Sequence, residues 1–298
     1  YYQNFSDAHN LMSYRHTRAH NSLLVNGIGQ PYSTEGYGSV MRAMGGQHIS
    51  YCLGDASHAY RSISNDPMWV DYFKQAGIEQ TPENGFGATP LTKYRRHVLM
   101  LHPHTVIVYD ELEASEAVRW EWLLHSPTEF KIDAVKKTLS TDNKTKGWVA
   151  VTQLFGGHVF TLSQTDRFVV PPAITGAEYP NQWHLTARVD GCSATRFLAI
   201  IQVGDEAVSI INRDGDTFNV GDWTIKAVLD ASKAPELTVS HRTEQAVFSY
   251  GTDNPALNGN FYSRQFTGSS LLYDEIDGAY QVVEMTDRSP ISTRVVNQ

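Results

Sequence analysis

Apolar and polar residues alternate along much of this chain. Short segments rich in β-branched and aromatic residues recur, and Gly, Pro, Asn and Asp separate them. Alternation with a period of two is typical of a strand that buries one face, and turn residues at short intervals are typical of a sandwich. The pattern therefore predicts an all-β fold built on a large antiparallel β-sandwich.

The clearest strands form a predicted hairpin. RRHVLML (95–101) and VIVYDEL (106–112) flank the link HPHT, and the second strand is almost entirely apolar before its acidic end. Such a strand is expected near the centre of a sheet. Further strands are predicted at 120–126, 148–155, 158–164, 184–190 and 195–203. In the first of these, WEWLLHS, one face is expected to enter the core: Trp120, Trp122 and Leu124.

One short helix interrupts the strands. Asp66 suits a helix cap, Pro67 suits the first helical position, and Gly77 suits the residue after the end, so we expect a helix over 67–76. The polar stretch 77–93 has three glycines and two prolines and is expected to be an irregular loop. Aromatic residues on the helix either stack on sugar rings or pack onto the sheet, and packing is favoured: Trp69, Tyr72 and Phe73.

The character of the sequence changes after Val203. Segment 208–229 contains a Gly-Asp or Asp-Gly turn, and segment 271–285 contains an Asp-Gly turn between alternating strands, which are hairpin signals. We therefore predict two domains, the large sandwich over 1–205 and a smaller β-sandwich unit over 206–298.

Composition narrows the class of protein. The chain has 32 acidic and 24 basic residues, a net charge of −8, which argues against a broad basic surface for nucleic acid. An anionic substrate must then be held locally. No apolar run approaches the roughly 18 to 20 residues of a membrane helix, so no membrane partner is expected. Cys52 and Cys192 fit no metal spacing and are expected to be free and buried.

The opening residues YYQNFSDAHN have neither the charged start nor the apolar stretch of a secretory signal. They do not resemble a natural amino terminus, and we expect the chain to be a piece of a longer protein.

The densest polar chemistry lies in SYRHTRAHNSLLVNGIGQ (13–30). In a helix, His16 and His20 would be neighbours able to share zinc, although the Glu of the H-E-x-x-H pattern is missing. In a strand they would stand roughly 13 Å apart at about 3.3 Å per residue, too far for one ion. The alternative is that these histidines are held by hydrogen bonds at the surface or the edge of the core.

Four segments occur in a recognisable order: RAHNSLLVNGIGQ (18–30), CLGDASHAY (52–60), YRRHVLMLHPHTVIVYDEL (94–112) and WEWLLHS. In these segments the chain resembles the heparinase II/III group of polysaccharide lyases, which includes alginate, oligoalginate, heparin and heparan sulfate lyases. The resemblance covers roughly residues 10–130, and the remainder only in its β character. It implies an amino-terminal α/α toroid joined to a β-sandwich, with substrate in the cleft between them, and we expect the toroid to be missing from this chain.

The resemblance also implies a zinc site and a reaction. The zinc ligands of the group are an upstream His and Asp and a His that matches His20, so only one ligand is expected here and the metal is expected to be absent from this chain alone. The reaction is β-elimination at a uronic acid, with tyrosine and histidine as acid and base. Those groups lie mainly on the toroid, so no catalytic residue is assigned here. Tyr14 is the one residue expected to contact substrate.

Other polar residues have simpler explanations. Asp110 and Glu111 are adjacent in a strand, point to opposite faces and cannot form the facing carboxylates of a glycosidase. Asp55 is interpreted mainly as a turn residue. Three histidines are expected on the surface of the hairpin: His97, His102 and His104.

The first hypothesis is therefore the β-sandwich portion of a lyase that cleaves an acidic polysaccharide, of alginate or heparin type, inactive without its toroid. The resemblance places such a protein in the periplasm or outside the cell. The alternative is a carbohydrate-binding or structural β module without catalytic history, in which the first 20 residues would form a closed edge rather than an open edge strand. A self-sufficient hydrolase is a weaker reading, because no nucleophile and base have suitable spacing.

Overall fold

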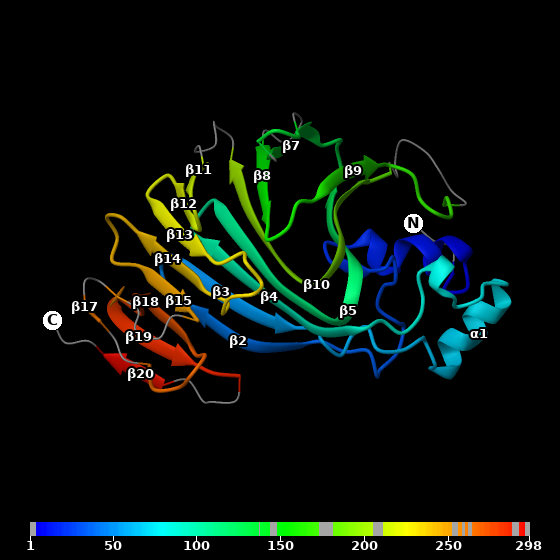
Figure 1. The fold of residues 1–298 in the computed structure, drawn as a ribbon, viewed down its shortest axis with the longest axis horizontal. Helices are drawn as coiled ribbons and strands as arrows, with labels where there is room; N and C mark the ends of the chain where they lie inside the picture. The colour runs from blue at the N-terminus through cyan, green and yellow to red at the C-terminus, as the bar shows by residue number, and fades with distance from the viewer. Residues whose placement is uncertain are drawn as a thin grey trace.

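The computed structural model describes residues 4–136, 138–143, 148–172, 181–204, 211–251, 256–257, 260–261, 264–287 and 292–295. Within these residues the chain is almost entirely β, as predicted, and forms two large antiparallel sheets (Figure 1). None of the helices in this part of the chain is long and apolar enough to cross a membrane.

The first sheet holds ten of the described strands in the order β2-β3-β4-β5-β10-β8-β7-β6, with β1 paired to β5 and β9 paired to β10. Its strands are β1 Leu23–Val25, β2 Ser39–Gly45, β3 Ile49–Asp55, β4 Leu91–Leu101, β5 Thr105–Ser126, β6 Lys131–Asp133, β7 Thr138–Asn143, β8 Trp148–Gly156, β9 Thr161–Thr165 and β10 Trp183–Gly204.

The second sheet runs β11-β12-β13-β14-β15-β18-β19-β20. Its strands are β11 Ile211–Asp214, β12 Thr217–Val220, β13 Trp223–Ala227, β14 Leu237–His241, β15 Val247–Tyr250, β18 Ser270–Ile276, β19 Ala279–Met285 and β20 Ser292–Val295, and a separate small pair joins β16 Ala256–Leu257 to β17 Asn260–Phe261. Both predicted hairpins are confirmed: the first turns at Gly215 and Asp216, between β11 and β12, and the second turns at Asp-Gly. Asp277 and Gly278 have φ of 52° and 80°, as a two-residue turn between β18 and β19 requires.

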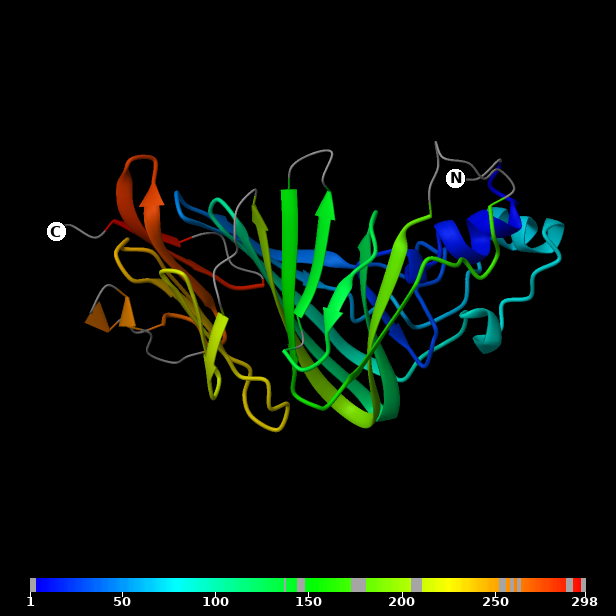
Figure 2. The same ribbon diagram turned by 90° about the horizontal axis from the view of Figure 1, so that it is seen from above.

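Strands β5 and β10 are each 22 residues long and bend as they cross the molecule (Figures 1 and 2). Each joins two strands that the sequence predicts as separate, 106–112 with 120–126 and 184–190 with 195–203. In β10 the ladder to β5 shifts register on either side of Cys192, and Gly191 takes φ of 72°, so bulges replace the expected turn. The strand predicted at 158–164 begins later, at Thr161.

The two sheets share a core between them. Ile107 and Tyr109 of β5 pack in one cluster with Phe218, Ile225 and Phe248 of the second sheet. Each such fully buried side chain stabilises the fold by roughly 1.5 to 3 kcal/mol. The predicted boundary at 205 lies where the chain passes from one sheet to the other, and the division into two domains stays a prediction.

The opposite face of the first sheet carries a second core. Trp120, Trp122 and Leu124 are buried there, as predicted, with Leu23 and Val25 of β1 packed against them. These residues fix the position of the amino-terminal segment, because β1 pairs with β5 in the register Leu23↔Trp122.

The predicted helix is confirmed as α1, Pro67–Gln75, and the Asp66 side chain accepts a hydrogen bond from the Met68 N–H. Its aromatic face packs: Phe73 is buried with Tyr32 and Phe86, and Trp69 lies against the same cluster. The loop after α1 contains a 3-10 turn, Pro82–Asn84. Strand β4 starts at Leu91, inside the predicted loop and four residues before the predicted strand.

Candidate functional site

Residues 16–22 lead into β1 along the edge of the second half of β5, where the Leu123 N–H donates to the Ser22 carbonyl, and they are called the strap. The sequence left a helix and a strand open for this segment, and the structure shows neither. The strap contains a 3-10 turn, Thr17–Ala19, and a π-helical turn, Asn10–Tyr14, precedes it. The described residues before His20 therefore form no edge strand. The comparison of an open with a closed edge strand thus cannot distinguish a lyase fragment from an independent module.

His16 anchors the start of the strap. It is fully buried, its Nδ1 accepts from the backbone and side chain of Arg18 at 3.1 and 3.0 Å, and its Nε2–H donates to the Gly85 carbonyl at 3.0 Å. Burial, and then the charge of Arg18, lower the pKa of His16 to about 3, so the ring is neutral. The expectation of a histidine held by hydrogen bonds is confirmed for His16.

His20 ends the 3-10 turn, and it is exposed. Tyr14 ends the π-helical turn with 47% of its surface exposed. Among the described residues, no group of three or more His, Cys, Asp or Glu side chains is placed to hold a metal ion. These residues therefore do not complete the implied zinc site, and the roles of His20 and Tyr14 stay predictions.

Two histidines that were not predicted as site residues lie against the strap, His125 and His184. The Arg18 carbonyl lies 2.9 Å from His125 Nε2, which in turn lies 3.2 Å from His184 Nδ1. Asn21 Oδ1 accepts from the His125 backbone N–H at 2.8 Å. Burial, and then His184, lower the pKa of His125 to about 4. The sequence could have indicated His125, because it belongs to the segment WEWLLHS. It could not have indicated His184, which comes opposite His125 only through the register of β5 and β10.

An arginine fastens the other end of the strap. Arg96 donates through Nη1 to the Asn21 carbonyl at 2.6 Å, and through Nε and Nη2 to both oxygens of Asp110 at 2.7 Å. Asp110 also accepts from the Trp122 indole at 2.9 Å. A bidentate pair of this kind fixes the guanidinium plane, so the strap and Arg96 form one rigid wall.

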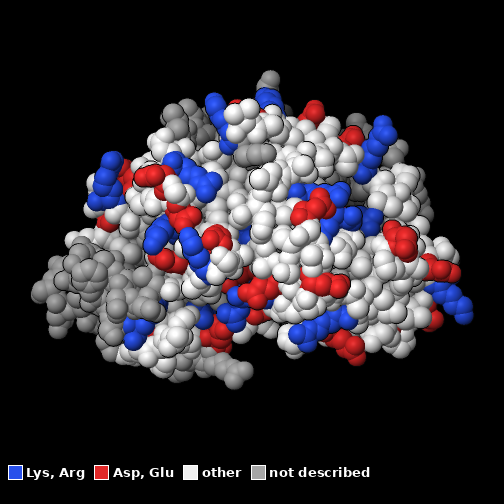
Figure 3. All heavy atoms as spheres, in the orientation of Figure 1, with Lys and Arg blue, Asp and Glu red and all other residues white. Residues whose placement is uncertain are grey.

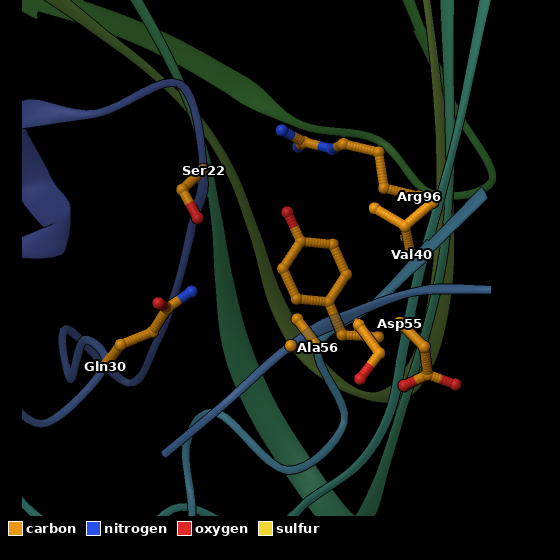
Figure 4. Close-up of a pocket in the computed structure, with 10 residues that line it drawn as sticks. Ser22, Gln30, Val40, Asp55, Ala56 and Arg96 are labelled. Carbon is orange, nitrogen blue, oxygen red and sulfur yellow. The ribbon is translucent and has the colours of Figure 1, made fainter. Parts of the chain in front are cut away.

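Beside this wall lies a cavity of about 300 Å³, called the strap cavity (Figure 4). Ser22 and Gln30 line one side, Asp55 and Arg96 the other, and the remaining surface is mostly apolar: Val40, Ala56 and the buried ring of Tyr94. A concave site with a mainly apolar lining and a few fixed polar groups is typical of small-ligand binding, and its volume suits one sugar residue.

The strap cavity offers recognition rather than proton transfer. Burial alone would raise the pKa of Asp55, but hydrogen bonds from Ser57 and from Arg95 lower it, so the carboxylate stays ionised. Burial raises the pKa of Tyr94, so its phenol stays protonated. The bond from the Ser57 N–H also confirms Asp55 as a turn residue, and the ion pair with Arg95 adds an orienting role.

A second polar cluster lies between the sheets. His97 is fully buried there, so its expected place on the hairpin surface is wrong, whereas His102 and His104 are exposed as predicted. Glu111 faces this cluster and Asp110 faces the strap, which confirms that the two carboxylates point apart. His97 lies inside because every second residue of β4 faces the intersheet core.

The two cysteines are unpaired, as predicted, but both are half-buried rather than buried. Figure 3 shows Lys and Arg interspersed with Asp and Glu over the face it presents, so neither sign covers this face. This agrees with the expectation that an anionic ligand is held by local groups.

Comparison with known proteins supports the fold. No protein-family model and no curated protein matches the sequence. Among solved structures, a heparinase III crystal structure aligns with a TM-score of 0.53 at 13% identity, over 84% of this chain and 32% of that one. A heparinase III with methylated lysines aligns with a TM-score of 0.52 at 13% identity, over 80% and 30%. The chain therefore has the fold of one part of heparinase III and spans about a third of the length of these structures.

Proposed function

We propose that this chain is the β-sandwich part of a polysaccharide lyase that cleaves a uronic-acid-containing polysaccharide, of heparin, heparan sulfate or alginate type, by β-elimination. The observation that carries the proposal is the likeness of the fold to heparinase III, together with the strap on which RAHNS lies. At 13% identity the likeness supports the architecture, and the reaction is an analogy that needs its own test.

In this proposal the sandwich binds and orients the polysaccharide. The strap cavity takes one sugar residue, with its hydroxyl groups on Gln30 and Arg96 and its apolar face on Val40 and Ala56. The acid and base of the elimination come from a helical domain of the parent protein. The two groups considered above in the strap cavity are poorly tuned for proton transfer, because the lowered pKa of Asp55 makes it a weak base and the raised pKa of Tyr94 makes it a weak acid.

The parent protein would hold zinc with His20 as one ligand, the other ligands coming from outside the described residues. The exposure of His20 suits such a shared role. Tyr14, exposed beside the strap, would contact the substrate chain. A protein with this substrate would work in the periplasm or outside the cell.

The alternative is a carbohydrate-binding module without a catalytic partner. The strap cavity supports it, because a binding module needs only such a site.

The test compares this chain with its longer parent protein. Elimination is followed by the absorbance of the unsaturated product on heparan sulfate and alginate, and zinc is measured in both proteins. The proposal expects turnover and zinc in the parent and neither in this chain. Turnover by neither protein, with oligosaccharide binding retained, would favour the binding module instead.

Binding by this chain is tested by calorimetry with oligosaccharides of both polymers. Gln30→Ala is expected to weaken binding at least fivefold, since it removes a hydrogen-bonding group from the strap cavity. Gln153→Ala, on β8 and outside the cavity lining, is the matched control and should bind normally. Equal affinity of the two variants would exclude the strap cavity as the sugar site.

A further inference from the structure

Two arginines of the amino-terminal segment lack an acidic partner. In the part of the chain that the structure describes, neither Arg15 nor Arg18 has a carboxylate oxygen within 4.0 Å. Arg18 donates only to neutral acceptors, His16 Nδ1 at 3.0 Å and the Asn84 carbonyl at 3.0 Å. Burial lowers the pKa of Arg18, and the charge of Glu121 raises it from a distance beyond that of an ion pair.

Arg15 packs its guanidinium on aromatic rings. Its guanidinium lies 4.8 Å from the Trp69 ring centre and 5.5 Å from that of Phe5, and its Nε is buried without a hydrogen-bond partner among the described residues. The ring faces attract the cation but supply no acceptor for its N–H groups. A buried donor without an acceptor costs stability, so the position of Arg15 is explained only in part by packing.

Other arginines of the fold with little exposed surface have acceptors for their N–H groups. Arg196 donates to three backbone carbonyls, and three further arginines pair with acids. Arg42 and Arg95 both pair with Asp287, at 2.8 and 2.7 Å, and Arg96 pairs with Asp110. Acids are plentiful, since the chain carries eight more acidic than basic residues, yet the structure places no carboxylate oxygen within 4.0 Å of the Arg15 guanidinium among the described residues.

Arg15 opens into a second cavity, of about 360 Å³, between the amino-terminal turns and α1, called the Arg15 cavity. The turns and α1 lie side by side at one end of the molecule in both views (Figures 1 and 2). Ser33 and Thr34 add hydroxyl groups to the lining, and Trp69 adds an apolar wall. Asp66 also lines the cavity, where one oxygen already caps α1.

This combination suits a ligand that carries an anionic group and free hydroxyls on the same small ring. The anion pairs with the Arg15 guanidinium, away from Asp66, and the hydroxyls donate to Asp66 and bond Ser33 or Thr34. A simple anion would use only half of this lining, and a neutral sugar would leave Arg15 without its acceptor.

We infer that the Arg15 cavity is an acidic-sugar subsite in which Arg15 binds the carboxylate or sulfate group of one residue of the chain. The inference rests on the proposed function and adds a second contact to the strap cavity. No covalent step is involved, and the subsite contributes affinity and the choice of an acidic sugar over a neutral one.

The test uses D-glucuronate, D-glucose and sodium sulfate as separate probes. The signal is the indole N–H resonance of Trp69 in a ¹⁵N-labelled protein, identified by its loss in Trp69→Phe. Glucuronate is expected to shift this resonance in a saturable way and glucose to bind at least tenfold more weakly. Saturable shifts by sulfate as well would extend the subsite to sulfated sugars, whereas sulfate without effect would restrict it to carboxylates.

Arg15→Gln is expected to weaken glucuronate binding at least tenfold. Arg61→Gln, at an exposed arginine five residues before Asp66 and outside the cavity lining, should leave it unchanged. An equal response to glucose and glucuronate, no response to either anion, or full binding by Arg15→Gln would overturn the subsite. If Gln30→Ala weakens oligosaccharide binding and Arg15→Gln does not, the acidic-sugar subsite is rejected and the proposed function stands. Glucuronate binding at Arg15 without any oligosaccharide binding would instead overturn the proposed function.

Discussion

His97 Nε2 lies 2.9 Å from Glu111 Oε1, and both side chains are fully buried between the two sheets. Burial lowers the pKa of His97, so the ring is neutral, with Nε2–H donating to Glu111 and Nδ1 accepting from the Tyr51 hydroxyl at 3.0 Å. Burial would raise the pKa of Glu111, but the hydrogen bond from His97 and the charge of Lys93 lower it to about 2. The carboxylate is thus an ion held inside the protein by its partners.

Glu111→Gln is expected to lower the free energy of unfolding by about 3 kcal/mol, because removing one member of a buried ion pair leaves its partners unsatisfied. The Lys93 ammonium lies 2.7 Å from Glu111 and 3.2 Å from the exposed Glu113. Glu113→Gln is therefore a matched control, with an expected effect under about 0.5 kcal/mol. Urea denaturation measures both, and equal effects would show that burial does not decide the strength of these pairs.

Stability is expected to fall as the pH drops from 7 to 5. His16 titrates at about 6.5 in the unfolded chain and at about 3 in the native protein, so the unfolded chain binds the proton more readily. The contribution of His16 is complete above pH 6.5 and is lost progressively below it, by about 2 kcal/mol at pH 5.

The pH effect is measured by urea denaturation of the wild type and of His16→Gln, whose side chain does not titrate. The difference in stability between pH 7 and pH 5 should be smaller in the variant by about 2 kcal/mol. His97 and His125 titrate in the same direction in both proteins, so they cancel in the comparison. An identical loss in both proteins would show that His16 is not held neutral.

Asp287, which follows β19 of the second sheet, pairs with two arginines of the first sheet. Its carboxylate pairs with Arg42 of β2 and Arg95 of β4, and Arg42 is almost fully buried. Asp287→Ala is expected to destabilise the fold by about 3 kcal/mol, since two arginines lose a shared partner. Asp190→Ala, which breaks the exposed pair with Arg188, should cost under about 0.5 kcal/mol.

A double-mutant cycle with Arg42→Met separates the pair from its surroundings. The coupling energy between Arg42 and Asp287 is expected to exceed about 1 kcal/mol. Strictly additive effects would mean that the Arg42–Asp287 pair does not help to hold the two sheets together.

Asn21→Ala is expected to destabilise the protein by about 1 kcal/mol, because the strap loses its bond to the His125 backbone. His20→Ala, one position earlier and exposed, should change the stability of this chain by less than about 0.5 kcal/mol. Thermal unfolding checks both. A larger loss for His20→Ala would give that residue a structural role that the strap geometry does not explain.

The all-β fold, the helix with its Asp66 cap and the buried faces of the strands follow from local pattern, because each depends on neighbours in sequence. The opposed directions of Asp110 and Glu111 follow from the same alternation. The length of β5 does not follow from local pattern. The polar segment between its two apolar halves resembles a connection, and only the pairing with β4 and β10 keeps this segment in the sheet.

The candidate site was predicted less completely. The segment that forms the strap stands out by its density of histidine and arginine, but which histidine is buried depends on Gly85, 69 positions away. The contacts of Arg96 with Asn21 and of His125 with His184 likewise join residues far apart in the chain. Register and packing across the sheet create these pairs, and a single sequence carries no trace of them.

The continuity of β5 makes the molecule one cooperative body. In its first half, the Tyr109 hydroxyl donates to the Val228 carbonyl, in the segment that follows β13 of the second sheet. In its second half, the His125 backbone N–H donates to Asn21 of the strap. Amide protons along a single ladder open together when no flexible joint divides them. Hydrogen exchange should therefore find β5 protected as one unit, so that loosening the intersheet core also loosens the wall formed by the strap and Arg96.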